Sequence, residues 1–299
     1  MKKFRFKKID AFATQKSRGN PAGYIWLDSE ADISALEMLQ IAKELKGFVN
    51  EVGYIHRKSD NLFNLKFYSS EGEVDFCGHA TIAIMYDLIK NSEGLRQRNV
   101  LKIQTNRGEL EVENRIERED AVFIMSPVPE VIKEIPGINK ISAGLKIQIS
   151  EIDRSLPISV INAGLSTLII PIKSLKSILS ILPDLKELKE FCIHSGIDII
   201  EVFTKDVVHK NNDYRTRVFA PKYGYLEDPA TGSGNSAFGY YLLGNNMWDH
   251  ETITIEQNGT IDNYNIVKLK KKQDDNRIER VLFGGGAITR IDGVYLLWC

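Results

Sequence analysis

The chain has 299 residues, about twice the length of a common single domain, so two compact domains or one large one are expected. Its 39 basic and 40 acidic side chains give a net charge of −1, which argues against a broad nucleic-acid-binding surface. No segment has the length and apolarity of a signal peptide or a membrane span, so we expect a cytoplasmic protein without a membrane partner. Three scattered cysteines without a Cys-x-x-Cys pair argue against a disulfide scaffold or a cysteine zinc site.

Short apolar strands alternate with amphipathic helices in the first part of the chain. Strands are predicted at residues 4–13 and 23–27, on either side of a turn at residues 17–21. A helix is predicted over residues 33–45, with Leu36, Leu39 and Ala42 on one face. Further strands are predicted at 51–56, 62–68, 100–104 and 109–112, with a helix after Gly78.

The second half of the chain repeats this order. A strand at 166–171 follows Asn162-Ala163-Gly164, a helix follows at 175–195, and Glu201-Val202-Phe203 echoes Glu51-Val52-Gly53. Residues 76–89 can also be laid on residues 230–243 without gaps, which indicates a duplication. The alternative is chance similarity between two amphipathic helices.

This order predicts two halves. The first spans residues 1–122 and is completed by a C-terminal strand at 288–299, and the second spans residues 123–287. Within the second half, the lysine-rich residues 268–272 are interpreted as a solvated loop. Three consecutive glycines at 284–286 follow a strand without a helix after them, so they are interpreted as a bend rather than a phosphate loop.

Both echoed segments place glycine and small polar residues where extended chain becomes helix. Backbone N–H groups at a helix start lack intrahelical acceptors and can bind an anion, so each segment is a candidate carboxylate cradle. Ordinary helix capping is the alternative for each one taken singly. The candidate binding residues are Gly78, Ala80 and Thr81 in the first segment, and Gly232, Ser233 and Gly234 in the second.

Three side chains near these helix starts are candidate catalytic groups. Glu51 lies in an apolar stretch that is expected to raise its pKa, which suits a proton shuttle; an exposed strand-edge glutamate is the alternative. His79 comes just after the helix start, where its imidazole can project towards a ligand. Asp228 precedes the second glycine turn and either orients a substrate or forms an Asx turn. Cys77 is a thiolate candidate, although a small core residue is favoured.

Four motifs in chain order resemble those of the phenazine-biosynthesis (PhzF-like) isomerase family, which has a diaminopimelate epimerase-like fold. They are Asp10-Ala11-Phe12 with Gly19-Asn20-Pro21-Ala22-Gly23, Asn50-Glu51, Cys77-Gly78-His79-Ala80-Thr81, and Asp228-Pro229-Ala230-Thr231-Gly232-Ser233. The resemblance implies an α+β fold of two pseudo-symmetric, hot-dog-like halves. Each half would be a mostly antiparallel sheet wrapped around a central helix, starting near His79 and Ser233.

The resemblance also implies a function. Glu51 would be the general acid/base, His79, Asp228 and Ser233 would assist proton movement and hold substrate, and Gly78 would contribute backbone amides. The reaction would be a biosynthetic isomerisation that moves a proton on a small, cyclic carboxylic acid related to dihydro-hydroxyanthranilate, in the cleft between the halves. It implies a homodimer and no metal or organic cofactor.

Departures from the family pattern leave the substrate open. Gly234-Asn235-Ser236 stands where the family often has Ala-His-Cys, and Asn50-Glu51-Val52 replaces Ser-Glu-Thr. Thr231 stands at the place that echoes Cys77, which excludes the symmetric two-thiol mechanism of the epimerases of this fold. A Cys77-dependent epimerase or dehydratase is one alternative. A non-catalytic carboxylate-binding protein is another.

Overall fold

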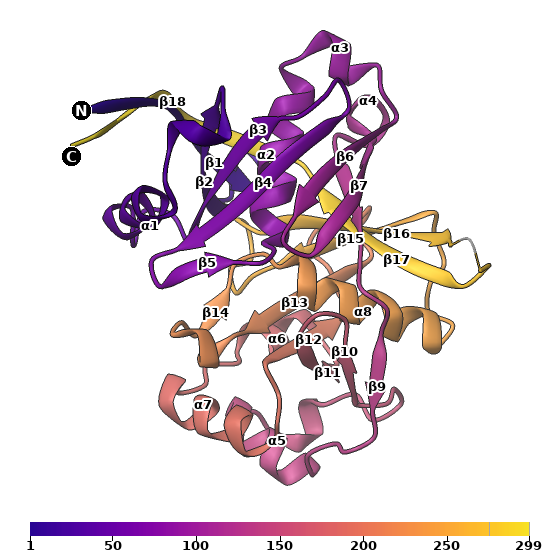
Figure 1. The fold of residues 1–299 in the computed structure, drawn as a ribbon. Coiled ribbons are helices and arrows are strands. Elements are labelled where there is room, and N and C mark those ends of the chain that lie inside the picture. The colour runs from indigo at the N-terminus through magenta and orange to yellow at the C-terminus, as the bar shows by residue number, and fades with distance from the viewer. Residues whose placement is uncertain (275, 299) are drawn as a thin grey trace. The chain divides into compact units, whose positions relative to one another are not determined.

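The computed structural model describes residues 1–274 and 276–298, and the chain divides into two compact units. Unit 1 comprises Met1–Met125 and Gly284–Cys299, and unit 2 comprises Ser126–Phe283. Figure 1 shows the elements of both units coloured along the chain. Within the described ranges, no helix has the length and apolarity needed to cross a membrane.

Unit 1 is a sheet wrapped around one helix, α2 (Gly78–Lys90). This helix, which runs beside the strands of the unit in Figure 1, packs against β1, β2, β3, β8 and β18. Most of its side chains are buried. A helix surrounded in this way is expected to be apolar on nearly every face, as the run from Ile82 to Ile89 is. The strands are β1 (Lys2–Ala11), β2 (Asn20–Leu27), β3 (Glu51–Arg57), β4 (Leu62–Ser69), β5 (Gly72–Val74), β6 (Val100–Thr105), β7 (Gly108–Asn114), β8 (Val122–Met125) and β18 (Ala287–Leu297).

The strand pairing of unit 1 is mixed. β1 pairs antiparallel with both β2 and β18, so the N-terminal and C-terminal strands are neighbours. β2 and β3 are parallel, joined through η1 (Glu30–Asp32) and α1 (Ala35–Glu44). β3, β4 and β5 are antiparallel, and β6 runs parallel to β4 before the antiparallel β7 and β8. Two short helices, α3 (Glu93–Arg96) and α4 (Ile116–Glu119), complete the unit.

Unit 2 repeats this plan around α8 (Gly232–Gly244), which packs against β10, β11, β12 and β16. β11 and β12 are parallel as β2 and β3 are, β13 pairs antiparallel with β12, and β14 pairs with β13. The strands are β9 (Glu130–Ile132), β10 (Ser159–Asn162), β11 (Ser166–Pro171), β12 (Ile199–Thr204), β13 (Tyr214–Phe219), β14 (Glu227–Asp228), β15 (Thr252–Gln257), β16 (Asn265–Gln273) and β17 (Glu279–Gly285), whose last two residues belong to unit 1. The helices besides α8 are α5 (Ile138–Leu145), η2 (Ile149–Glu151), α6 (Leu175–Leu179), α7 (Leu185–His194) and η3 (Pro221–Tyr223). A sheet around a central helix, predicted for both halves, is therefore confirmed within each unit.

Two helix predictions need correction. In α1 the predicted Ala42 is buried and Leu39 packs against the core, but Leu36 is 81% exposed, so the predicted face was wrong at Leu36; Met38 and Ile41 are buried instead. The single helix predicted at 175–195 is two helices, α6 and α7. Proline has no N–H to continue a helix, and Pro183 lies between them. Asp184 then caps α7 by accepting from the backbone N–H groups of Lys186 and Glu187.

The lysine-rich residues 268–272 form part of β16 and are not a loop. Alternate side chains of the strand point to opposite faces, so buried Val267 and Leu269 anchor one face of the strand. Lys270 is also buried along most of its length, and its Nζ lies 3.3 Å from Glu251 Oε1. The bend predicted at 284–286 was wrong for Gly284 and Gly285, which end β17, and Gly286 is the single residue between β17 and β18.

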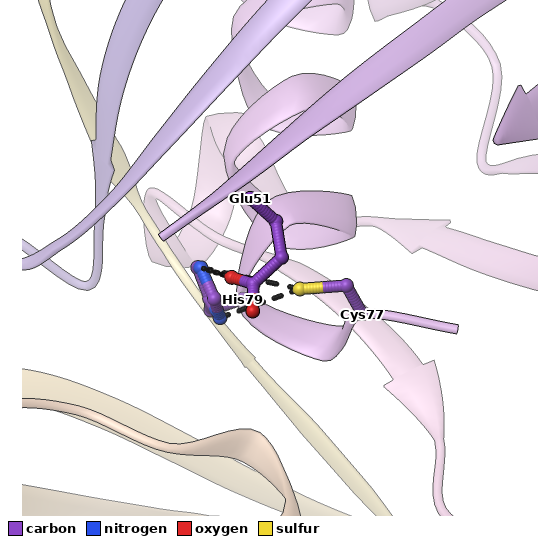
Figure 2. A group of neighbouring side chains, drawn as sticks. All are labelled: Glu51, Cys77 and His79. Carbon is purple, nitrogen blue, oxygen red and sulfur yellow. Dashed lines mark hydrogen bonds and ion pairs between the residues drawn. The ribbon is translucent and has the colours of Figure 1, made fainter. Parts of the chain in front are cut away.

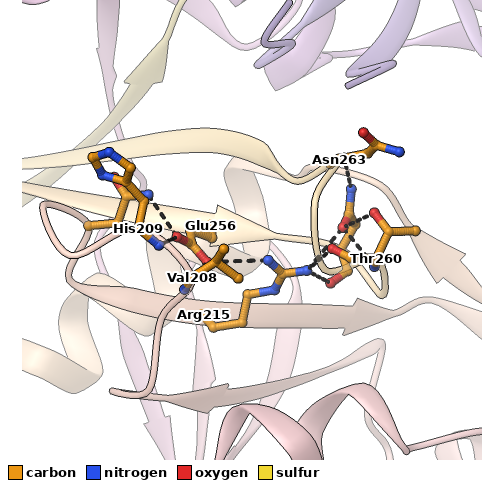
Figure 3. Close-up of polar contacts among 8 residues, drawn as sticks. Val208, His209, Arg215, Glu256, Thr260 and Asn263 are labelled. Atoms are coloured by element: carbon orange, nitrogen blue, oxygen red, sulfur yellow. Dashed lines mark hydrogen bonds and ion pairs between the residues drawn. The ribbon is translucent and has the colours of Figure 1, made fainter. Parts of the chain in front are cut away.

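A fully buried ion pair joins β13 to β15 in unit 2 (Figure 3). Arg215 Nη1 lies 3.3 Å from Glu256 Oε2, and neither side chain is exposed to solvent. Glu256 also accepts from the backbone N–H groups of Val208 and His209, at 3.0 and 2.8 Å. Arg215 donates to the carbonyl oxygen of Asn258 at 2.8 Å and to that of Thr260. The pair therefore anchors two loops to the sheet.

Candidate active site

Glu51 is the first residue of β3, and the glycine-containing turn before β2 supports this end of the strand. Parallel pairing places Ala22 of β2 opposite Glu51. Asn50 donates from Nδ2 to Asn20 Oδ1 at 3.0 Å, which ties the two strand ends together. At Gly19 the φ angle is +61°, and a Cβ there would lie 2.5 Å from the carbonyl oxygen of Ala11. Only glycine fits this turn, and the pairing of β2 with β3 places the motif that contains it beside Glu51.

The start of α2 provides the other two side chains of the site. Cys77 is the N-cap residue in an extended conformation, and His79 is the second residue of the helix. The Thr81 hydroxyl donates to the carbonyl oxygen of Cys77 at 2.7 Å, which fixes this first turn. Ala80 and Thr81 are fully buried, whereas Gly78 and His79 are half-buried. Ala80 and Thr81, both predicted to bind substrate, are therefore enclosed by the protein, and the backbone N–H of Thr81 donates to the carbonyl oxygen of Cys77 at 3.0 Å.

Glu51, Cys77 and His79 come together in one cluster, as Figure 2 shows. His79 Nε2 lies 3.2 Å from Glu51 Oε2, with side-chain exposures of 13% and 22%. The Cys77 Sγ atom lies 3.5 Å from His79 Nδ1. The carboxylate reaches from β3, whereas the imidazole and the thiol belong to the helix start (Figure 2). Sequence reasoning predicted Glu51 and His79 but favoured the core for Cys77, which is buried and also contacts His79.

The electrostatics of the cluster favour a charged Glu51 and a charged His79. Burial acts to raise the pKa of Glu51, but polar contacts and charge from His79, together with Cys77, outweigh it and lower the pKa. The raised pKa predicted from the apolar sequence around Glu51 was therefore wrong. Burial also acts to lower the pKa of His79, but its contact with Cys77, together with the contact and negative charge of Glu51, holds it well above its usual value. The result is a carboxylate paired with an imidazolium.

The thiol of Cys77 is the neutral member of the cluster. Burial raises its pKa, and the charge of Glu51 adds to this effect against the opposing effect of His79. A protonated thiol is a weak base, so its position beside His79 is better suited to orienting the ring than to removing a proton. The ligand atoms of the three residues lie within 4.8 Å of one another, a spacing at which they could also share one metal ion.

The predicted residues of the second helix start lie in unit 2. Asp228 Oδ1 accepts from the backbone N–H of Ala230 at 3.3 Å, which is the predicted Asx turn. Thr231 caps α8 by accepting from the backbone N–H of Gly234, and Ser233 is half-buried. Gly232 and Gly234 are buried. The geometry of a capped helix start is present, and Ser233 is its partly exposed residue.

The ion pair between Glu51 and His79 predicts how kcat/KM depends on pH. Replacing His79 with Gln removes the group that lowers the pKa of Glu51, while burial continues to raise it. The acid limb of kcat/KM, where the carboxylate becomes protonated, is therefore expected to move to higher pH in H79Q. An acid limb at the wild-type position in H79Q would show that His79 does not control the charge of Glu51.

Comparison with known proteins identifies the family. A model described as "Phenazine biosynthesis-like protein" matches residues 9–293. An uncharacterized isomerase of Clostridium acetobutylicum is 29% identical over 301 residues, covering 97% of both chains. An uncharacterized isomerase of Bacillus subtilis is 26% identical over 283 residues, covering 93% of this chain and 94% of its own.

Solved structures show the same fold. A PhzF-family phenazine biosynthesis protein of Bacillus anthracis superposes with a TM-score of 0.86 at 22% identity, covering 99% of this chain and 100% of its own. A hydroxyproline epimerase of Agrobacterium vitis superposes with a TM-score of 0.56 at 11% identity, covering 99% of this chain and 91% of its own. The predicted epimerase-like fold is thereby confirmed. With a family model that matches nearly its whole length, the chain belongs to the phenazine biosynthesis-like (PhzF-like) family of isomerases.

Proposed function

We propose that this isomerase moves a proton on a small, cyclic carboxylic acid, with Glu51 as the general acid/base. The observation that carries the proposal is the 3.2 Å contact between Glu51 Oε2 and His79 Nε2. Because His79 keeps Glu51 ionised, the carboxylate can accept a proton from a substrate carbon without first losing one of its own. The protonated Glu51 then returns that proton to a second carbon, which shifts the double bond and restores the carboxylate.

His79 supports both steps by its positive charge. While Glu51 holds the substrate proton, the imidazolium remains beside a neutral acid and next to the negative charge that develops on the substrate. The backbone N–H groups at the start of α2, including that of Gly78, are proposed to contribute hydrogen bonds to the substrate. Asp228 and Ser233 are proposed to hold the substrate as well. The related dihydro-hydroxyanthranilate skeleton, a homodimer and a biosynthetic role remain predictions from the resemblance.

Cys77 distinguishes the proposed isomerase from the alternative enzymes, because an epimerase or dehydratase that uses the Cys77 thiol as its base would lose turnover without it. We expect Cys77→Ala to keep turnover within about tenfold of wild type, since the thiol is protonated and contributes only to ring position. Steady-state kinetics on candidate cyclic acids measure this. Loss of turnover in C77A, with turnover retained in Glu51→Gln, would establish the thiol-dependent alternative instead.

A further inference from the structure

A second buried glutamate lies in unit 2, outside the cluster already described. Glu201 is the third residue of β12 and is 0% exposed. Neither of its carboxyl oxygens has a hydrogen-bond partner among the described residues. Glu256, which is equally buried, has Arg215 and several N–H donors as partners. Burying a carboxyl group without partners costs free energy, so its retention calls for a functional explanation.

Glu201 lies on the helix-facing side of β12, as Glu51 does on β3, but two positions further along: Glu51 is the first residue of β3 and Glu201 the third of β12. In unit 1, Gly53 lies against the central helix, and a Cβ there would be 2.4 Å from Ile84 Cδ1. In unit 2, the ring of Phe203 packs on that of Phe238 at a centroid distance of 4.7 Å. Residues 84 and 238 correspond in the gapless alignment of the two helices. Each glutamate precedes its helix-facing residue by two positions, so both side chains point to the helix face of their strands.

The carboxyl group of Glu201 is aimed at the start of α8. A Cβ on Gly234 would lie 2.8 Å from Glu201 Oε2, so only glycine allows the carboxyl group this close to the first turn. The helix has 13 residues, and the backbone N–H groups of its first turn have no acceptors within the helix. The side chain of Thr231 accepts one of them, the N–H of Gly234. Ser233 of the same turn is half-buried and reaches solvent. Glu201 therefore lies behind a helix start at which Ser233 is half-buried and Thr231, Gly232 and Gly234 are buried.

Asp228 is the charged group that acts on Glu201. Val218 of β13 pairs with Glu201 on one side and with Asp228 of β14 on the other, so the three side chains lie in one row on one face. Ile169 of β11 and the first turn of α8, which also pack against Glu201, contribute no charge. Burial first, and the charge of Asp228 second, raise the pKa of Glu201 well above its usual value.

We propose that the start of α8 is a carboxylate-binding site whose affinity depends on the proton of Glu201. With Glu201 neutral, the half-buried Ser233 presents its backbone N–H and hydroxyl to an anion at the positive end of the helix, against the single charge of Asp228. When Glu201 ionises, a second negative charge beneath the first turn repels the ligand. The choice of a carboxylate as the ligand rests on the proposed function. The position of Glu201 behind the helix start is independent of that function.

The test is binding of 2-aminobenzoate, a cyclic carboxylate that cannot isomerise, measured by calorimetry from neutral to alkaline pH. Wild-type affinity is expected to fall as Glu201 ionises, by up to about tenfold per pH unit. In Glu201→Gln, which keeps the shape and the neutral state, affinity should be flat over the same range. Thr216→Val is the matched control, because Thr216 is buried on the same face, has an unpartnered hydroxyl and does not titrate. T216V should follow wild type.

Three outcomes would overturn the proposal: no binding to wild type, no pH dependence in wild type, or the same dependence in E201Q. Infrared spectroscopy with carboxyl-labelled glutamate gives a readout that needs no ligand. Wild type should show a protonated carboxyl signal at neutral pH that E201Q lacks, and absence of that signal in wild type would contradict the neutral Glu201. Failure of the proposed function can be told apart from failure of this proposal. It would appear as full turnover in Glu51→Gln, while the pH dependence of 2-aminobenzoate binding stayed unchanged.

Discussion

Replacing Glu51 with Gln is expected to lower turnover by about 10²–10⁴-fold while substrate affinity stays near that of wild type. The amide keeps the shape of the side chain but has no lone pair basic enough to take a proton from carbon. It also removes the negative charge that helps to hold the pKa of His79 above its usual value, so the imidazole should titrate at lower pH in E51Q. Steady-state kinetics, calorimetry and NMR titration of the His79 ring measure the three effects.

The matched control for E51Q is Glu71→Gln. Glu71 is an exposed glutamate of the same unit, in the turn between β4 and β5, where it pairs with Lys46 on the surface. Screened surface pairs contribute little, so E71Q should retain wild-type kinetics. Equal turnover in E51Q and E71Q would contradict the assignment of Glu51 as acid/base.

Replacing Glu256 with Gln is expected to lower the free energy of unfolding by about 3–5 kcal/mol. The variant leaves the Arg215 guanidinium buried without its counter-charge, and neither side chain is solvent-exposed in the wild type. It also weakens the acceptor for the N–H groups of Val208 and His209, so the loop before β13 loses an anchor (Figure 3). Denaturant unfolding measures the loss.

Glu109→Gln provides the comparison for this effect. Glu109 pairs with Lys102 at 2.7 Å, but both side chains are nearly half-exposed. An exposed pair is worth about 0–1 kcal/mol, so E109Q should be much milder than E256Q. Equal losses in the two variants would show that the burial of the Arg215–Glu256 pair does not determine its contribution.

The positions of the two central helices could be predicted because local signals coincide there. Gly78 and Gly232 follow extended residues and precede apolar runs, and the two segments align without gaps. The exposed face of α1 could not be predicted in the same way. Leu36 fits a helical apolar stripe as well as Met38 does, and only contact with the sheet decides which stripe is buried.

The candidate site was predictable in composition but not in electrostatics. The apolar residues around Glu51 correctly indicate burial, and burial alone raises the pKa of a carboxyl group. The opposite shift comes from His79, which is distant in sequence and is brought to Glu51 by the packing of α2 against β3. Likewise, the echo between Glu201 and Glu51 was visible in the sequence, but the missing partners of Glu201 appear only in the fold.

The central claim is that Glu51 moves a carbon-bound proton, and hydrogen exchange in deuterated water tests it most directly. Candidate cyclic acids are incubated with wild type and with E51Q and followed by NMR. We expect wild type to deuterate a substrate carbon or shift its double bond, and E51Q to bind the same acid without either change. Binding by wild type with no deuteration and no double-bond shift, or equal exchange by E51Q, would contradict the account.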